Sequence, residues 1–268
     1  MRVEAWEASA LPLSYTRIED RIGKRPCYAS GRCTGRHGGR AMRERVLGTL
    51  TIGQAPRPDV TPIIDRHVPA EVRRIHRGVL DRLSPGEIDV RYRPTAGEAA
   101  LVTRLADGST VELSRRHMQD GVQQALFGLE AEGCTVILLL CTGTFAGLQC
   151  RKAWLVEPDH VIPPLVAGLL EGRQLGIVVP IAGQIASESG KWGGLARPPL
   201  FAVASPYTDM PAAVGAAGAA LQAQGAAAIL LDCIGFTERH RAALTPLGLP
   251  VILSNAVAAK AVGELLGG

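Results

Sequence analysis

The chain has 268 residues, of which 47% are hydrophobic and only 4% are aromatic, so its core must be built from Val, Ile, Leu and Ala. Residues 1–45 hold ten of the 29 Lys and Arg residues but five of the 25 Asp and Glu residues, which leaves the rest of the chain nearly neutral and argues against a nucleic-acid partner. No apolar run approaches the roughly 20 residues of a membrane-spanning helix and no leader-like segment opens the chain, so we expect a cytoplasmic protein with no membrane partner.

Residues 1–45 show no sustained hydrophobic period, and their second half is rich in glycine and arginine. Such a segment buries too little apolar surface to offset the entropy of ordering the chain. We therefore predict a disordered or extraneous extension, with translation beginning at Met42, just before the first strand.

From Val46 onward, strand-like runs alternate with helix-like runs. The run VLGTLTIG (46–53) predicts a strand, and the prolines that follow suit a loop and the first turn of a helix. A helix is expected from a cap at Ser114 to a stop at Gly133, leading into the strand TVILLLC. This alternation predicts an α/β fold with a mainly parallel sheet.

A second series with the same layout begins at Leu175. It contains the strand LGIVVP, a helix-like segment with Lys191 and Trp192, and a short strand at 199–205. A helix at 211–224, the strand AAAILLDC, the strand PVILS and a last helix complete it. We predict a first lobe at 46–172 and a second at 173–254, with the helix 255–266 packing back on the first lobe.

Cys141 and Cys233 each end a buried strand in one of the two series. Ligands of open parallel sheets bind beyond the carboxyl ends of the strands, so we expect both thiols in one site. A helix N-terminus would lower a thiol pKa and leave one cysteine as thiolate beside a thiol. Such a pair can remove a proton from one face of a carbon acid and return a proton to the other. The alternative is that both are small buried hydrophobic residues.

Several polar residues near the strand ends are candidates for binding a small carboxylate substrate. Hydroxyls and backbone N–H groups at the start of a helix can hold a carboxylate, and an arginine can contact it with two hydrogen bonds. The candidates are Gln54, Arg57, Thr142, Gly143, Thr144, Thr237 and Asn255. Ordinary helix caps and a solvated arginine are the alternatives. Asp232 is expected to make a structural hydrogen bond.

The sequence shows no glycine fingerprint for a dinucleotide or a phosphate loop, and no His/Asp/Glu spacing typical of a metal site. The six cysteines include no CxxC pair, so we expect reduced thiols. We therefore predict neither a cofactor nor a metal ion.

Several segments resemble the AroM family, in order over most of residues 46–266. They are TIGQAPRPDV, AGE at 96–98, LSRR at 113–116, VILLLCTGTF, EPDHVIPPLV, LGIVVP, LDCIGFTERHR and PVILSNAVAA. AroM proteins are similar in turn to the aspartate/glutamate/hydantoin racemase superfamily. The resemblance implies two flavodoxin-like lobes related by pseudo-twofold symmetry, with one catalytic cysteine from each.

The resemblance also implies an activity, a cofactor-independent racemase or epimerase that transfers a proton at a carbon next to a carboxylate or amide. The alternatives are a one-cysteine enzyme of the decarboxylase or maleate-isomerase type and a non-catalytic binder linked to aromatic amino-acid metabolism. Amino-acid racemases of the superfamily carry Cys-Thr-His where this chain has Cys233-Ile234-Gly235. By analogy, a homodimer is the expected assembly.

Overall fold

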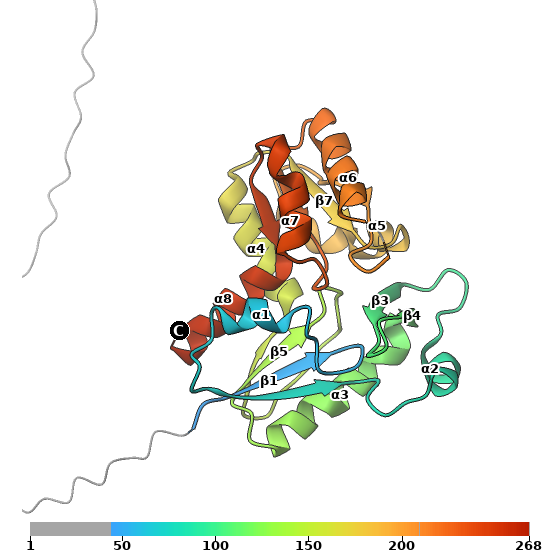
Figure 1. The fold of residues 1–268 in the computed structure, drawn as a ribbon, viewed down its shortest axis with the longest axis vertical. Coiled ribbons are helices and arrows are strands. Elements are labelled where there is room, and N and C mark those ends of the chain that lie inside the picture. The colour runs from blue at the N-terminus through green and yellow to red at the C-terminus, as the bar shows by residue number, and fades with distance from the viewer. Residues whose placement is uncertain (1–43, 209, 268) are drawn as a thin grey trace, which may run out of the picture. The chain divides into compact units, whose positions relative to one another are not determined.

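The computed structural model describes residues 44–208 and 210–267, so the expectations for the N-terminal extension lie almost wholly outside the described residues. The described part forms two α/β lobes, each built on a four-stranded parallel sheet (Figure 1). The predicted fold class is confirmed. None of the described helices combines the length and the apolar character that a membrane crossing requires.

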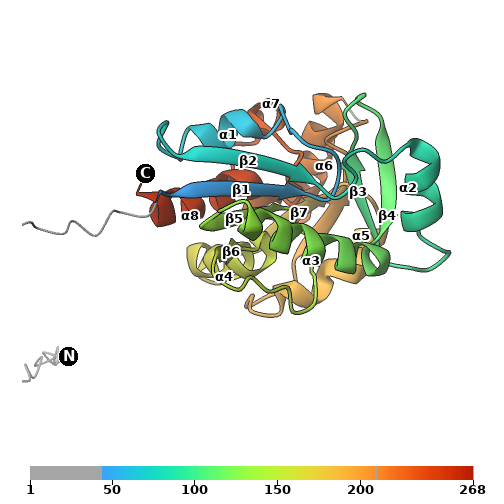
Figure 2. The same ribbon diagram turned by 90° about the horizontal axis from the view of Figure 1, so that it is seen from below.

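The sheet of the first lobe has the strand order β2-β1-β5-β6 (Figure 2). Its strands are β1 (Val46–Thr51), β2 (Arg73–Gly78), β5 (Val136–Leu140) and β6 (Trp154–Val156). Every residue of β1 and β5 is buried, as expected for central strands of a parallel sheet that is covered on both faces.

The sheet of the second lobe has the order β10-β9-β7-β8. Its strands are β7 (Leu175–Val179), β8 (Leu200–Val203), β9 (Ala228–Leu231) and β10 (Val251–Leu253). In both lobes the first strand lies between the second and the third, and the fourth lies beside the third. The two lobes thus share one strand order, and the third strand of each is the one that leads to a cysteine.

Helices cover both faces of each sheet. They are α1 (Thr61–Asp65), α2 (Pro85–Tyr92), α3 (Arg115–Ala131), α4 (Pro158–Leu170), α5 (Gly183–Glu188), α6 (Pro211–Ala223), α7 (Glu238–Leu244) and α8 (Ser254–Leu266), with 3₁₀ turns η1 (Ser189–Trp192) and η2 (Thr245–Leu247). Helix α3 covers one face of the first sheet and α2 packs beside α3, whereas α1 and α8 cover the other face. Helices α6 and α7 cover one face of the second sheet.

Helix α4 lies within the range predicted for the first lobe, 46–172, but packs on the sheet of the second lobe. It follows β6 in sequence, but its buried face of Ile162, Val166 and Leu170 packs with residues of β7 and β9 and with Trp192. The second lobe therefore begins, by packing, before residue 172. Helix α8 follows the last strand of the second lobe and contacts α1, β5 and β6, so each lobe supplies a helix that packs beside the other (Figure 1).

A β-hairpin extends the first lobe beside the carboxyl ends of its strands. Its strands β3 (Ala100–Arg104) and β4 (Thr110–Ser114) pair antiparallel and join through a turn at Asp107-Gly108, where Gly108 has φ of +87°. The sequence analysis missed this hairpin. It leads directly into α3, whose predicted cap is confirmed because Ser114 Oγ accepts a hydrogen bond from the His117 backbone N–H at 3.3 Å.

Candidate functional site

Cys141 and Cys233 occupy matching positions in the two lobes. Each follows the third strand of its sheet, and each Sγ accepts a hydrogen bond from the backbone N–H of the glycine two residues later. The distances are 3.4 Å from Gly143 N to Cys141 Sγ and 3.5 Å from Gly235 N to Cys233 Sγ. Both thiols line one cavity of about 20 Å³. Each lobe thus contributes one thiol to the same narrow space.

A small set of polar side chains completes the wall of this cavity. They are Arg57, Thr103, Thr142, Gln184 and Tyr207. The Oγ1 atom of Thr103 is buried without a hydrogen-bond partner, whereas Thr142 Oγ1 donates to the Asp232 carbonyl oxygen at 3.4 Å. Thr103 is therefore a residue of the cavity wall whose hydroxyl has no hydrogen-bond partner.

Burial raises the pKa of both thiols, which differs from the expected thiolate. The segment 141–153 forms no helix and α7 begins only at Glu238, so neither thiol lies at a helix N-terminus. The N–H groups of Gly143 and Gly235 oppose the rise in pKa but do not outweigh burial. Without a ligand, both cysteines are therefore thiols at neutral pH.

Arg57 and Tyr207 form a contact chain to Cys233. The Tyr207 hydroxyl lies 3.6 Å from Cys233 Sγ and 3.3 Å from Arg57 Nη2. The guanidinium of Arg57 also pairs with both carboxylate oxygens of Asp59, at 2.9 and 2.7 Å. Burial opposes the charge of Arg57, but Asp59 and Tyr207 outweigh burial and raise its pKa. The positively charged guanidinium of Arg57 therefore contacts the Tyr207 hydroxyl, which in turn contacts Cys233.

A buried cluster of charges lies on the Cys141 side. Lys191 Nζ lies 2.7 Å from Asp232 Oδ2 and 3.6 Å from Glu188 Oε2, and all three side chains are buried. Burial opposes the lysine charge, but the two carboxylates outweigh burial and raise the Lys191 pKa. Lys191 also donates to the Thr142 carbonyl oxygen at 2.9 Å, so the cluster holds the residue next to Cys141.

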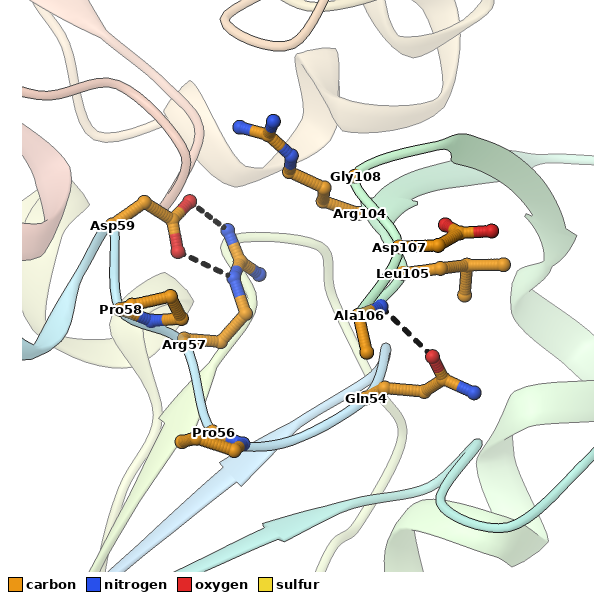
Figure 3. A pocket seen from close by; sticks show the side chains of 10 residues that line it. All are labelled: Gln54, Pro56, Arg57, Pro58, Asp59, Arg104, Leu105, Ala106, Asp107 and Gly108. Carbon is orange, nitrogen blue, oxygen red and sulfur yellow. Dashed lines mark hydrogen bonds and ion pairs between the residues drawn. The ribbon is translucent and has the colours of Figure 1, made fainter.

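A second pocket of about 470 Å³ adjoins Arg57 on its other side (Figure 3). Its walls are the loop after β1 and the turn of the β3–β4 hairpin. Gln54 Oε1 ties the two by accepting a hydrogen bond from the Ala106 backbone N–H at 2.8 Å. Arg57 thus lies between this open pocket and the narrow cavity of the thiols.

The AroM protein family matches residues 47–266, which is nearly all of the described chain. The chain belongs to the AroM family. The resemblance drawn from the sequence motifs is confirmed.

Solved structures of other enzymes share the two-lobe fold. A glutamate racemase isoform from Bacillus anthracis is 15% identical, with a TM-score of 0.58, over 84% of this chain and 82% of the other. Allantoin racemase from Pseudomonas fluorescens is 14% identical, with a TM-score of 0.54, over 83% and 90%. Arylmalonate decarboxylase is 14% identical, with a TM-score of 0.54, over 83% and 93%. No curated protein matches the AroM chain by sequence.

The predicted site residues of this AroM protein fall into two groups. Five line the thiol cavity, namely Arg57, Cys141, Thr142, Gly143 and Cys233. The other four lie elsewhere. Gln54 lines the second pocket, Thr144 Oγ1 donates to Glu188 Oε2 at 3.4 Å, Thr237 is the N-cap residue of α7, and Asn255 is buried in α8.

Two of these four residues support the loop after Cys233. Asn255 Nδ2 donates hydrogen bonds to the carbonyl oxygens of Ile234 and Phe236. The Thr237 backbone N–H donates to His240 Nδ1 at 2.9 Å, which closes the first turn of α7. Both residues therefore hold the chain that carries Cys233 without reaching the cavity. Asp232, expected to make a structural hydrogen bond, accepts one from Ser254 Oγ at 3.5 Å and also forms an ion pair with Lys191.

Three polar residues that line the cavity were not predicted from the sequence. Tyr207 follows β8 and Gln184 follows β7, so the strand-end rule that selected the cysteines also covers them. Thr103 lies in the hairpin, whose Asp-Gly turn between alternating runs was a usable signal. A further constraint appears at Gly235, where a Cβ atom would overlap the Tyr207 ring.

Proposed function

We propose that this AroM protein is a cofactor-independent isomerase of the racemase or epimerase type. Its reaction would move a proton at a carbon next to a carboxylate or amide of a small molecule. The observation that carries the proposal is that two thiols, from equivalent strand ends of two lobes, line one cavity. The glutamate and allantoin racemases with the same fold support this reaction class.

The chemistry needs one thiolate and one thiol on opposite faces of the carbon. The thiolate takes the proton, the electron pair moves into the adjacent carbonyl group, and the other thiol gives its proton to the opposite face. The N–H groups of Gly143 and Gly235 stabilise whichever sulfur is charged. Since burial raises both thiol pKa values, we infer that the substrate-bound site must bring a further positive or hydrogen-bonding group to one sulfur.

The substrate is proposed to be a small carboxylate or cyclic amide. Thr103, Gln184 and Gly143 line the cavity, and their hydroxyl, amide and backbone groups are of the kind that hydrogen-bonds a planar oxygen-bearing group. A cavity of about 20 Å³ has room for about one water molecule, so the lobes must separate to admit a substrate.

A one-cysteine decarboxylase is the second candidate, and the asymmetry of the two thiols favours it. Cys233 has a side-chain partner, the Tyr207 hydroxyl, whereas the hydrogen bond found for Cys141 comes from a backbone N–H. A decarboxylase needs one acid to protonate the carbanion that remains when carbon dioxide leaves. Arylmalonate decarboxylase shares the fold, which supports this alternative.

The test is deuterium exchange from solvent into a panel of amino, hydroxy, malonic and cyclic-amide acids, followed by NMR. Cys141→Ala and Cys233→Ala are compared with wild type, and Cys150→Ala serves as a matched control because Cys150 does not line the cavity. Label at one carbon that is lost in both active-site variants, but not in the control, supports the isomerase.

Other outcomes of this panel separate the alternatives. Loss of carbon dioxide from a malonate that depends on Cys233 alone supports the decarboxylase. Binding of a panel acid without any exchange supports a non-catalytic binder and contradicts the isomerase. Exchange that survives in either cysteine variant removes that cysteine from the mechanism.

A further inference from the structure

Glu157, Asp159 and His160 form a cluster at the start of helix α4, outside the thiol cavity. Each offers one ligand atom, and these atoms all lie within 4.8 Å of one another. The three residues occupy the N-cap and first-turn positions of one helix, which brings their side chains to the same place. The spacing Glu-x-Asp-His matches none of the common metal motifs, so the sequence analysis found no signal there.

The two carboxyl groups of this cluster are buried and incompletely paired. Glu157 is 6% exposed and Asp159 is 9% exposed. Glu157 Oε2 and Asp159 Oδ1 are buried without a hydrogen-bond partner, and Glu157 does not cap its helix with its side chain. The charge contact of Glu157 is with His160, whose Nδ1 atom lies 3.4 Å from Oε1. Buried oxygens of this kind are costly unless a cation or a proton satisfies them.

We propose that Glu157, Asp159 and His160 bind one divalent metal ion. A set of two carboxylates and one imidazole suits ions such as Mn²⁺ and Zn²⁺, which accept both oxygen and nitrogen ligands. Bonds of about 2.0–2.2 Å place two ligands of one ion at most about 4.4 Å apart. The cluster therefore needs only small side-chain rotations to close on an ion.

The surroundings give the ion a route to the site. His160 is exposed, with 67% of its side chain accessible. Asp159 and His160 line an open groove of about 940 Å³ that also contains Arg115, Thr144 and Lys191. Lys191 is paired with Asp232 and Glu188, and Asp159 Oδ1 remains without a hydrogen-bond partner. The proposal does not depend on the two-thiol chemistry.

The test is Mn²⁺ binding to the full chain after chelation and buffer exchange, measured from the loss of the free-ion signal in electron paramagnetic resonance. We expect one tight equivalent per chain and a rise in Tm on loading. Glu157→Gln, Asp159→Asn and His160→Ala should each weaken binding at least about ten-fold. Glu171→Gln, an exposed carboxylate at the other end of the same helix, should leave binding unchanged.

The competing account is a proton shared between the two buried carboxyl groups. It predicts no saturable binding of Mn²⁺ or Zn²⁺, or binding that is unchanged in all three variants, and either result overturns the proposal. A third result would also overturn the proposal, namely zinc binding by the thiols. Such binding would persist in the carboxylate variants and be lost in Cys141→Ala. Circular dichroism checks that each variant is folded. If a carboxylate variant does not fold, His160→Ala still tests the proposal, because the His160 side chain is exposed.

Discussion

At the scale of single residues, the environment of each thiol decides how readily it ionises. Both lie in a buried cavity, which raises the pKa, and both accept one backbone N–H, which lowers it. Cys233 has two further groups that lower its pKa, the Tyr207 hydroxyl and the charge of Arg57, against one that raises it, the charge of Asp232. Cys141 has Lys191, but Glu188 and Cys233 oppose it. The surroundings of Cys233 therefore favour the thiolate form more than those of Cys141 do.

The variant Tyr207→Phe tests that support. Removing the hydroxyl takes away a hydrogen bond that lowers the Cys233 pKa, so this pKa should rise further. Because only the thiolate reacts with iodoacetamide, the pH midpoint for alkylation of Cys233 should move upward while that of Cys141 stays in place. Peptide mass spectrometry across a pH series measures both rates.

Tyr92→Phe is the control for the loss of a tyrosine hydroxyl, since Tyr92 lies beside Gly121 of α3 and does not line the thiol cavity. Equal shifts for Cys141 and Cys233 in Tyr207→Phe would show a general loosening of the site. That result would contradict a specific contact between Tyr207 and Cys233.

Individual site residues could be predicted only where residue type and position agreed. The two cysteines and Arg57 combine a reactive or charged group with a strand end, and the structure brings them to one cavity. Tyr207 and Gln184 also follow strands, but neither residue type by itself indicates acid or base chemistry. Thr237 and Asn255 follow strands as well, yet Thr237 is bonded to the His240 ring and Asn255 to backbone carbonyls near Cys233. Whether a polar side chain faces a cavity or a loop depends on tertiary contacts that spacing does not encode.

At the scale of elements, the apolar strands and long helices were predictable because their burial sets the sequence period. Strand β2 was missed because its sequence RRIHRG is only half-buried at the edge of the sheet. Helix α4 was missed because its sequence carries Pro163 and Pro164 within the helix. The short segment of α5 and η1 was predicted to be helical, but the burial of its Lys191 in an ion-pair cluster was not predicted.

The variant Lys191→Met tests the role of that segment. It leaves the buried Asp232 without its cation, whereas Glu188 keeps Arg115 at 3.1 Å, so we expect a loss of about 3–5 kcal/mol in the free energy of unfolding. Because pairing raises the Lys191 pKa, this stabilisation is present at neutral pH and is lost only as the pH rises through that raised pKa. Urea denaturation at neutral pH measures the difference.

Arg173→Met is the matched control, because Arg173 pairs with Glu171 on the surface, where the two side chains are 61% and 76% exposed. Such a pair contributes at most about 1 kcal/mol. If Lys191→Met destabilised the protein no more than this control, the buried cluster would be a minor contributor to the fold.

At the scale of the whole described chain, contacts across the two lobes hold the thiol cavity narrow. Arg115 Nη1 at the start of α3 lies 3.1 Å from Glu188 Oε1 in the second lobe. The Lys191 ammonium and the Asp232 carbonyl both hold Thr142 of the first lobe. These contacts join the same loops that carry the thiols, so separation of the lobes would open the cavity and break them together.

The last prediction follows from this closed arrangement. Arg115→Met removes the pairing of α3 with Glu188, worth about 0.5–1.5 kcal/mol, so the open state should become roughly two- to twelve-fold more populated. Iodoacetamide should then alkylate Cys141 and Cys233 faster by that factor at a fixed alkaline pH. Arg116→Met is the control, because Arg116 is the exposed next residue of the same helix. A faster reaction at one thiol alone would indicate a local change, whereas equal acceleration at both requires movement of one lobe relative to the other.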